Sequence, residues 1–205
     1  MIISEEHQEY EKDWWGNCAN TYGEEEKQIT YAKYMGLSFF HNGKSPYNIY
    51  MGGKSVIDIG GGPSSLLLKC VSLKEGTVID PCDYPEWVAE RYYRVGIRPF
   101  KLEGEEKFDW LCDEVWCYNV LQHTKDPAKV CANMLSYGKI IRIFEWIDTK
   151  QTLGHLHILT KEKLDQWLGG EGQTVMLNQS TLKGRAYYGV FKGEYFGSYG
   201  TTLRD

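Results

Sequence analysis

A run of small and polar residues after a short apolar segment is the part of the sequence best suited to bind a ligand. Residues 54–65 read Lys-Ser-Val-Ile-Asp-Ile-Gly-Gly-Gly-Pro-Ser-Ser, so Asp58 is followed by Gly60, Gly61 and Gly62. Glycine has no Cβ, which lets the backbone approach a ligand closely. A helix that begins after such a turn points free N–H groups at the ligand. The pattern predicts a strand, a ligand-binding turn and a helix start, and the acid favours a ligand with hydroxyl or ammonium groups.

Polar residues also follow two later apolar segments. Asp80, followed by Pro81, ends one predicted strand, and Asn119 ends another, a short way before His123. Ligands of open α/β sheets bind outside the carboxyl ends of the strands, so these residues are candidates to face the glycine turn. Imidazole titrates near neutrality, which makes His123 a candidate general base. A histidine that only packs against a ligand fits the pattern equally well.

A third polar group lies at and after the predicted strand 139–146. It contains Glu145, Asp148, His155 and His157. In an extended segment both histidines point to one side, which allows three interpretations: contact with a substrate, a metal site, or loop structure only. Two histidines and a scattered acid are a weak metal signal. No metal is therefore predicted, and Glu145, His155 and His157 are kept as candidate catalytic residues.

Other charged residues allow two interpretations each. Glu103 follows a predicted strand and begins the charged segment 103–107, which is either a ligand contact or a solvated loop. Lys183, Arg185 and Lys192 surround the last predicted strands. They either meet an acidic substrate or form a solvated face, and the solvated face is the more common explanation for such cations.

The segments before the glycine turn are predicted to be mainly helical. Residues 5–15 and 24–37 form the two helices, and the second has an acidic first turn that suits a helix N-terminus. Trp14 and Trp15 end the first helix, where they either anchor a core or belong to a lid over a ligand in the turn. Residues 38–53 are predicted to be a loop with turn signals at Asn42-Gly43 and Ser45-Pro46.

Strand and helix patterns alternate from residue 54 to about residue 146. This alternation predicts an α/β domain with a parallel sheet and helices on both faces. Two further strands fit a hairpin at the edge of the sheet, which would make it mixed. The predicted strands are 56–59, 76–80, 97–102, 114–119, 139–146, 174–178 and 186–191, and the predicted helices between them are 64–73, 85–95, 126–137 and 160–168.

The overall composition is that of a globular protein. The 205 residues fit a single domain, with a helical extension or lid at 1–50, a core at 51–193 and a tail at 194–205. The net charge of −5 disfavours a broad electrostatic contact with nucleic acid. The six cysteines lack zinc-finger spacing and are predicted to be reduced, mostly buried thiols. No signal peptide is recognised and no apolar run approaches the roughly 20 residues that cross a bilayer, so a soluble, cytoplasmic protein is predicted.

Two kinds of fold place a glycine turn after their first strand. The dinucleotide-binding motif Gly-x-Gly-x-x-Gly fits incompletely, because its third glycine falls on Ser65. The turn instead resembles the first motif of class I S-adenosylmethionine-dependent methyltransferases, Asp/Glu-x-Gly-x-Gly-x-Gly, with Ser64 in the last small position. Asp80 matches the acid that such enzymes use for the two ribose hydroxyls. The run 118–123, Tyr-Asn-Val-Leu-Gln-His, followed by Asp126-Pro127, resembles their motif after the fourth strand.

The resemblance covers about residues 50–147 and implies a Rossmann-like sheet of seven strands, mostly parallel, with an antiparallel edge strand and a helical N-terminal segment. It implies S-adenosylmethionine as cofactor, S-adenosylhomocysteine as product, and methyl transfer by direct displacement, which depends mainly on positioning. In addition to the catalytic candidates Asn119, His123, Glu145, His155 and His157, we expect these residues to bind the cofactor: Trp14, Asp58, Gly60, Gly61, Gly62, Asp80, Pro81, Glu103, Asn119, Val120 and His123.

The methyl acceptor is expected to be a small molecule methylated on oxygen or nitrogen. Amino-methylating enzymes of nucleic acids usually carry Asn/Asp-Pro-Pro-aromatic after the fourth strand, whereas this chain has Asn-Val-Leu-Gln at 119–122, so methylation of a base is disfavoured. Methylation of a protein, and a catalytically idle module that binds the cofactor and acts through partners, both stay open. The sequence does not fix the oligomeric state.

Overall fold

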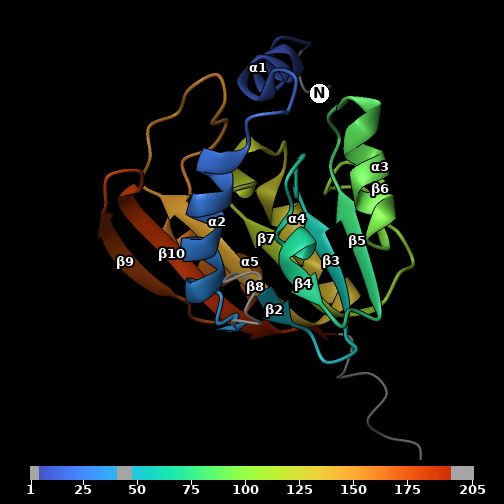
Figure 1. The fold of residues 1–205 in the computed structure, drawn as a ribbon. Coiled ribbons are helices and arrows are strands. Elements are labelled where there is room, and N and C mark those ends of the chain that lie inside the picture. Colours follow the sequence, from blue (N-terminus) through green and yellow to red (C-terminus); the bar gives the residue numbers. More distant parts are fainter. Residues whose placement is uncertain (1–4, 41–47, 195–205) are drawn as a thin grey trace, which may run out of the picture.

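The computed structural model describes residues 5–40 and 48–194 (Figure 1). Its main feature is a seven-stranded sheet in the order β6-β5-β3-β7-β8-β10-β9. All neighbouring pairs from β6 to β8 are parallel, whereas β10 runs antiparallel to both β8 and β9. The strands are β3 (Ser55–Ile59), β5 (Glu75–Ile79), β6 (Ile97–Phe100), β7 (Cys112–Tyr118), β8 (Gly138–Ile147), β9 (Gln173–Asn178) and β10 (Lys183–Lys192).

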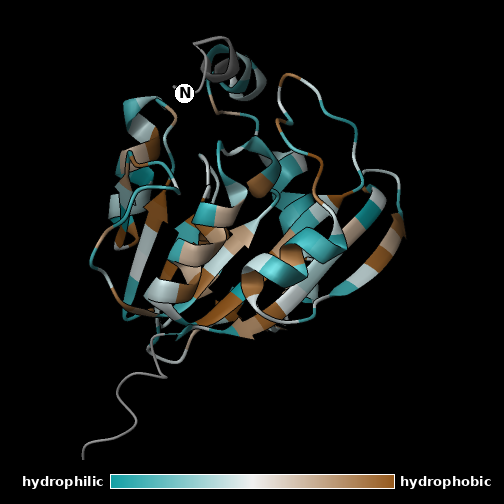
Figure 2. Cartoon of the chain, turned by 180° about the vertical axis from the view of Figure 1, so that it is seen from behind, coloured by the Kyte–Doolittle hydropathy of each residue, from teal (hydrophilic) through white to brown (hydrophobic). Residues whose placement is uncertain are grey.

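Helices cover both faces of this sheet. In Figure 1, α2 lies in front of the strands, and α1 lies above the end of the sheet. The helices α4 and α5 cover the opposite face, which Figure 2 shows from behind with hydrophilic and hydrophobic residues mixed along them. The helices are α1 (Glu5–Trp15), α2 (Tyr22–Tyr34), α3 (Glu86–Arg94), α4 (Pro127–Tyr137) and α5 (Lys161–Leu168), with short 3₁₀ turns η1 (Leu66–Lys69) and η2 (Leu121–His123).

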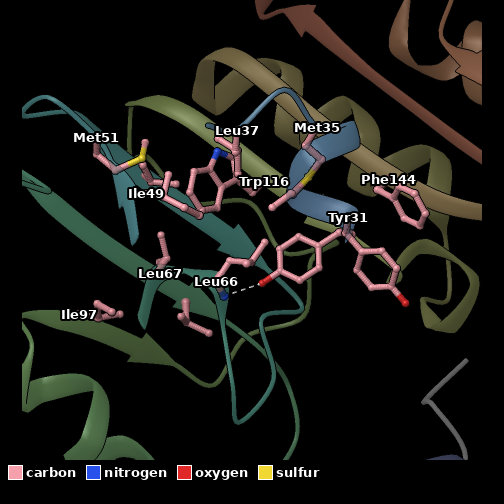
Figure 3. Close-up of a cluster of buried hydrophobic side chains, with 14 of the residues drawn as sticks. Tyr31, Met35, Leu37, Ile49, Met51, Leu66, Leu67, Ile97, Trp116 and Phe144 are labelled. Carbon is pink, nitrogen blue, oxygen red and sulfur yellow. Dashed lines mark hydrogen bonds between the residues drawn. The ribbon is translucent and has the colours of Figure 1, made fainter. Parts of the chain in front are cut away.

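Each face of the sheet has its own apolar core. Figure 3 shows part of the core beneath α2, where Tyr31 stacks on Phe144 with ring centroids 4.4 Å apart and Trp116 is completely buried. The other core contains the apolar residues of α4 and α5, among them Val130 and Leu164. Burial of both faces explains why the central strands read as nearly continuous apolar runs.

These features confirm the predicted fold class: an α/β protein with a mostly parallel, seven-stranded sheet and a helical N-terminal segment. The predicted helix ends are also correct where capping signals define them. The Asp126 side chain accepts a hydrogen bond from the N–H of Lys129 at the start of α4, and Thr160 does the same at the start of α5. Gly169 ends α5 in the left-handed conformation that favours glycine.

The prediction was wrong in two neighbouring segments. The expected helix 64–73 is only the 3₁₀ turn η1, followed by β4 (Cys70–Val71). The expected loop 38–53 contains β1 (Phe39–Phe40) and β2 (Asn48–Tyr50), and these two strands form a small sheet with β4. Pairing of Cys70 with Ile49 holds the chain extended where the local pattern favoured a helix. The turn signals at 42–43 and 45–46, and the tail from 195 on, lie outside the described residues.

The six cysteines are free, four of them buried and two half-buried, as predicted for reduced thiols. Within the described parts of the chain, every helix is too short or too polar to cross a membrane. The proposed division of the chain at residues 50 and 193 and the cytoplasmic location stay predictions.

Candidate functional site

A cavity of about 430 Å³ opens at the carboxyl ends of β3, β5, β7 and β8. The glycine turn, the loops after β5, β6 and β7, and the loop after β8 line one part of it. The helices α1 and α2 and the turn between β9 and β10 line the rest. Ligands of parallel α/β sheets bind at this end, and the volume lies within the usual range of small-molecule sites.

The glycine turn approaches the cavity with its backbone. Gly60 and Gly62 have φ values of +69° and +60°, which side-chain-bearing residues rarely adopt. A Cβ on Gly60 would lie 2.4 Å from a methyl carbon of Val120, so no larger residue fits. Gly61 does not line the cavity, because it packs against the Asp58 carboxylate, which a Cβ would approach to 2.8 Å. The three predicted glycines therefore form the turn, and two of them face the ligand space.

Two buried tyrosines fix the shape of the turn. Tyr92 donates its hydroxyl to the Gly62 carbonyl (2.7 Å) and accepts the N–H of Ser65 (2.8 Å). Tyr118 accepts the N–H of Leu66 (3.0 Å) and donates to Asp58 (2.6 Å). Each phenol thus closes two hydrogen bonds at once, and the turn is held in one shape before any ligand binds.

Asp58 organises the turn from below. Its carboxylate is completely buried and accepts hydrogen bonds from Ser65 (2.5 Å) and Tyr118, and its Oδ1 has no hydrogen-bond partner among the described residues. Burial raises the pKa of this carboxyl to about 7, although the two hydroxyl donors oppose the shift. We expected Asp58 to orient the turn and to contact a ligand ammonium group. It does not line the cavity, so it acts on a ligand through the turn and through its charge.

Asp80 lies at the cavity wall, as its position at a strand end predicted. Its Oδ2 accepts the N–H of Gly62 (3.0 Å), and its Oδ1 accepts the N–H of Cys82 and the hydroxyl of Tyr84, both at 3.0 Å. Burial raises the pKa of the carboxyl, and these donors oppose the rise. A carboxylate has about four lone-pair sites, so a ligand hydroxyl can use the remaining site or replace Tyr84. Pro81 also lines the cavity.

The loop after β6 adds acids on the same side. Glu103 lines the cavity and forms an ion pair with Lys125. Glu105, in the segment predicted to be either a ligand contact or a solvated loop, also lines the cavity. It is buried and accepts the backbone N–H groups of Lys125 (2.7 Å) and Asp126 (3.0 Å). Glu105 therefore holds the start of α4 against this loop.

The end of β7 presents Asn119 and Val120 to the cavity. Asn119 has a φ of +59°, a conformation that asparagine tolerates better than most residues, and Val120 packs on the glycine turn. Glu145 was expected to be a catalytic residue of this site, and the structure corrects this. It is completely buried and accepts the N–H groups of Val120 (3.0 Å) and Leu121 (3.1 Å), so its carboxylate shapes the loop from beneath and contacts no cavity. Burial raises its pKa to about 7.

His123 lines the cavity and contacts residues from two other segments. Its Nδ1 lies 3.2 Å from Oε1 of Glu11 on α1, and its Nε2 lies 3.3 Å from Nε2 of Gln122. His155 stands edge-on to the His123 ring, with centroids 5.0 Å apart. Burial lowers the pKa of His155, and the nearby His123 lowers it further.

The two histidines after β8 do not point to one side. His155 lines the cavity, whereas the Nε2 of His157 lies 3.2 Å from the backbone oxygen of Lys125 and faces away from the cavity. The N–H groups of Leu156 and His157 both donate to the carbonyl of Gln122. Among the residues that the structure describes, no group of three or more His, Cys, Asp or Glu side chains could hold a metal ion.

The helix α1 covers the cavity. Tyr10, Glu11, Trp14 and Trp15 line it, and Trp14 is nonetheless 60% exposed, so it is no core anchor. The Trp15 ring lies beside Gly62, where a Cβ would meet it at 3.5 Å. Trp15 also packs against the core beneath α2, so it fits both the anchor and the lid interpretation, and the lid stays a prediction.

Several lining residues escaped sequence reasoning. Tyr31 and Trp146 contribute an aromatic wall, and Glu24 and Lys27 form an ion pair at the start of α2. None of these has a motif around it. The packing of α2 onto the sheet brings Tyr31, Glu24 and Lys27 to the site, and Trp146 lies at the carboxyl end of β8. Of the three late cations, Lys183 lines the cavity and Arg185 pairs with Asp148 (2.9 Å), whereas Lys192 lies elsewhere.

No protein-family model matches the chain, and no curated protein sequence matches it. Solved structures do resemble it. A DhpI complex with S-adenosylhomocysteine is 11% identical with a TM-score of 0.60, and the match covers 94% of this chain and 98% of that one. The magnesium protoporphyrin IX methyltransferase ChlM of Synechocystis PCC 6803, with bound S-adenosylmethionine, is 13% identical with a TM-score of 0.56 over 91% and 97%. The N-methyltransferase NodS of Bradyrhizobium japonicum WM9, with S-adenosyl-L-homocysteine, is 17% identical with a TM-score of 0.51 over 68% and 78%.

At these identities the likeness concerns the fold. The strand order, the position of the glycine turn and the structural neighbours agree, and the chain has the fold of class I S-adenosylmethionine-dependent methyltransferases.

Proposed function

We propose that the chain is an S-adenosylmethionine-dependent methyltransferase that transfers a methyl group to oxygen or nitrogen of a small molecule. The observation that carries the proposal is the coincidence, in one cavity, of a glycine turn with no room for side chains and the acid Asp80 at the neighbouring strand end. The three structural neighbours are methyltransferases or bind this cofactor or its product, which supports the same reaction.

The residues present fit S-adenosylmethionine chemically. The cofactor carries a sulfonium, an ammonium group and a ribose with two hydroxyls. The cavity offers a backbone cradle at Gly60 and Gly62, a carboxylate acceptor at Asp80, and the buried negative charge of Asp58 behind the turn. In this arrangement Asp80 would accept the ribose hydroxyls, and Pro81, Glu103, Asn119 and Val120 would border the cofactor. When bound, the cofactor supplies an electrophilic methyl group.

The chain's own contribution to the reaction is mainly positioning. Methyl transfer from a sulfonium needs an acceptor atom held in line with the methyl group. The aromatic wall of Tyr31 and Trp146 and the cover formed by α1 would hold a small acceptor and exclude water. His123 is the candidate base for an acceptor that must lose a proton, and His155 is a second polar contact in the same part of the cavity. Residues of α1 line one side of the cavity, and its volume of about 430 Å³ suits a small molecule better than a macromolecule.

The proposal is tested by titration calorimetry of the wild-type protein with S-adenosylmethionine, S-adenosylhomocysteine and NAD. We expect the first two to bind and NAD not to bind. Asp80→Ala should weaken S-adenosylmethionine binding by more than about tenfold, because a charge-assisted contact to two hydroxyls contributes about 1.5–3 kcal/mol. Asp83→Ala, three residues further along and exposed, is the matched control.

Two results would contradict this. If neither S-adenosyl compound binds the wild type, the proposed function is wrong. If they bind but Asp80→Ala binds equally well, only the assignment of Asp80 to the ribose fails. The expectations that nucleic acids and membranes are not partners, and the open oligomeric state, are unaffected by either outcome.

A further inference from the structure

We propose that Glu11 of α1 is a positioning residue for His123, and that the two form a carboxylate–imidazole pair whose other ring nitrogen, Nε2, takes the proton of the acceptor. The role of His123 as a base rests on the proposed function. The pairing of Glu11 with His123 does not depend on that function. It assigns a role to a helix that lies some hundred residues away from the β7 loop in the sequence and that carries no motif.

The first observation concerns the proton on His123. Glu11 Oε1 lies 3.2 Å from Nδ1, and the Glu11 and His123 side chains are 17% and 24% exposed. The two atoms are within ion-pair distance without the alignment of a hydrogen bond. A carboxylate only accepts hydrogen bonds, so its proximity favours a proton on Nδ1. In a neutral imidazole the other nitrogen, Nε2, then carries the lone pair.

The second observation requires the same tautomer from the opposite side of the ring. Gln122 directs its amide nitrogen at Nε2 of His123, at 3.3 Å, and donates from the same nitrogen to Oδ1 of Asn119, at 2.7 Å. Gln122 is completely buried. An amide N–H needs an acceptor, so Nε2 must be unprotonated. The contacts with Glu11 and Gln122 therefore both favour the same tautomer.

The surroundings suit an imidazole that gains a proton during the reaction. Among the described residues, the carboxyl group of Glu11 contacts it and the buried Glu145 beneath the loop interacts with it electrostatically, and both favour an imidazolium. His155 meets the ring edge-on, and burial lowers its pKa, which favours its neutral form beside an imidazolium. The contact from Gln122 is longer than the usual 2.9–3.0 Å, so an acceptor hydroxyl or ammonium group can displace it.

The proton and electron balance of the step is simple. Nε2 of His123 takes the proton from the acceptor O–H or N–H, and the acceptor atom bonds to the methyl carbon of the cofactor. The carbon–sulfur bond breaks with its electron pair left on sulfur, which becomes a neutral sulfide. Glu11 keeps the Nδ1 proton in place throughout and does not touch the reacting atoms.

The pair also makes α1 part of the site. Tyr10, next to Glu11, packs on Gly154 in the loop after β8, where a Cβ would approach the Tyr10 ring to 2.5 Å. The helix therefore contacts both the loop that carries His123 and the loop that carries His155. If α1 moves away, the cavity loses its cover and His123 loses the carboxylate that fixes its tautomer in the same motion.

The direct test is the tautomer of His123 in the cofactor-free protein. Long-range ¹H–¹⁵N correlation of ¹⁵N-histidine-labelled protein at about pH 8.5, where an ordinary imidazole is neutral, distinguishes Nδ1–H from Nε2–H. His123→Gln identifies the His123 signals. We expect the wild type to show the Nδ1–H tautomer. Glu11→Met should shift the population toward Nε2–H, and Glu11→Gln, which keeps a neutral acceptor, should retain more of the Nδ1–H form than Glu11→Met does.

Glu9→Met is the matched control, because Glu9 is an exposed glutamate of the same helix and does not line the cavity. It should leave the His123 signals unchanged. An Nε2–H tautomer in the wild type overturns the proposal even if every variant fails to fold. A Glu11→Met spectrum identical to the wild type at His123, with the amide spectrum intact, also overturns it.

A second readout follows once an acceptor is known. Glu11→Met should lower kcat by roughly ten- to a hundredfold, part of the range for general acid–base catalysis, with a smaller change in KM. Equal losses in Glu9→Met would show a general effect of helix damage and contradict the specific role. Failure of the wild type to bind S-adenosylmethionine would sink the proposed function but would leave the tautomer result standing, so the two ideas fail separately.

Discussion

Buried carboxylates at the two ends of the seven-stranded sheet have pKa values shifted in opposite directions. At the amino end of β7, Glu114 is completely buried and is paired with Lys54 (2.6 Å) and Arg142 (2.7 Å). Burial opposes its ionisation, but the hydrogen bonds from Arg142, Lys54 and Trp116 outweigh it and lower the pKa to about 2. At the carboxyl end, Asp58 and Glu145 are equally buried, and burial raises the pKa of each to about 7.

The difference lies in the donors. Hydroxyl and backbone N–H groups surround Asp58 and Glu145, and neither forms a salt bridge within residues 5–40 and 48–194. Arg142 also donates to the carbonyl of Met35 at the end of α2 (2.7 Å), so the Glu114 cluster ties a helix to the sheet. At the amino end of the sheet, the buried ion pairs of Glu114 thus hold α2 against the strands. The carboxyl end leaves its negative charge uncompensated, next to the cavity where we place a cationic cofactor.

Removing the paired carboxylate should give the largest effect on stability. Glu114→Ala leaves Arg142, whose side chain is only 13% exposed, without its carboxylate. Breaking a buried pair in this way costs about 3–5 kcal/mol. Denaturant unfolding at neutral pH measures this loss, and Glu75→Ala is the matched control. Glu75 pairs with Arg98 at the surface, and exposed pairs contribute only about 0–1 kcal/mol.

The pH dependence of Glu114 sharpens this prediction. The folded-state pKa lies below the ordinary value of 4.5, so the stabilisation is complete above about pH 4.5 and is lost as the pH falls toward about 2. The difference between the wild type and Glu114→Ala should therefore shrink in acid. Equal losses for Glu114→Ala and Glu75→Ala would mean that the amino-end cluster does not hold the fold together.

The unpaired carboxylate Glu145 should give a smaller effect of opposite sign. Its folded-state pKa lies above the ordinary value of 4.5, so the folded protein holds a proton that the unfolded chain has released between about pH 4.5 and 7. Stability therefore falls as the pH rises through that window. Glu145→Gln removes this contribution, and the Gln oxygen can still accept the N–H groups of Val120 and Leu121, which both reach Oε1 in the wild type.

The measurement is unfolding of the wild type and Glu145→Gln at about pH 5 and pH 8. Relative to the wild type, the variant should gain at least about 1 kcal/mol between the two pH values, since one pKa unit corresponds to about 1.4 kcal/mol. Glu114→Gln, with the same chemical change at the other end of the sheet, should show no such gain. If the stability difference between Glu145→Gln and the wild type is the same at both pH values, the Glu145 carboxylate is stabilised in the folded protein and its charge is compensated.

The sequence predicts the fold better than the site, because strands and helix ends depend on residues close in sequence whereas the site depends on contacts between distant segments. Strand order and helix ends follow from local features, such as the Asp126-Pro127 cap and the glycine after Leu168. The expected helix after the glycine turn fails because Cys70 pairs with a segment some twenty residues earlier. That pairing is a tertiary event, and the three leucines at 66–68 fit either outcome.

Within the site, strand ends could be predicted but side-chain directions could not. Asp80 and Asn119 line the cavity because each follows a strand. Glu145 sits at a strand end too, yet it points beneath the next loop, and the sequence contains no sign of that choice. Glu11 was missed because it is one of four glutamates in a charged helix, and only the docking of α1 brings it to His123.

The smallest effect we predict concerns how the carboxyl end recognises charge. S-adenosylmethionine carries a sulfonium that S-adenosylhomocysteine lacks, so a buried negative charge behind the turn favours the former. Asp58→Asn removes that charge, while its remaining side-chain oxygen can still accept the hydroxyls of Ser65 and Tyr118. At about pH 8, where the wild-type carboxyl with a pKa of about 7 is mostly ionised, the affinity ratio of S-adenosylmethionine to S-adenosylhomocysteine should fall by about three- to tenfold.

The same charge should be titratable in the wild type. As the pH falls below about 7, Asp58 gains a proton, and the preference for the cationic compound should weaken in the wild type but stay constant in Asp58→Asn. Calorimetric titration of both compounds at about pH 6 and pH 8 measures this. Asp109→Asn, an exposed residue outside the cavity, controls for net charge. If Asp58→Asn and Asp109→Asn instead give the same affinity ratio of S-adenosylmethionine to S-adenosylhomocysteine, Asp58 only shapes the glycine turn and does not recognise the charge of the ligand. The difference between Asp58 and Glu114 would then affect stability and not ligand binding.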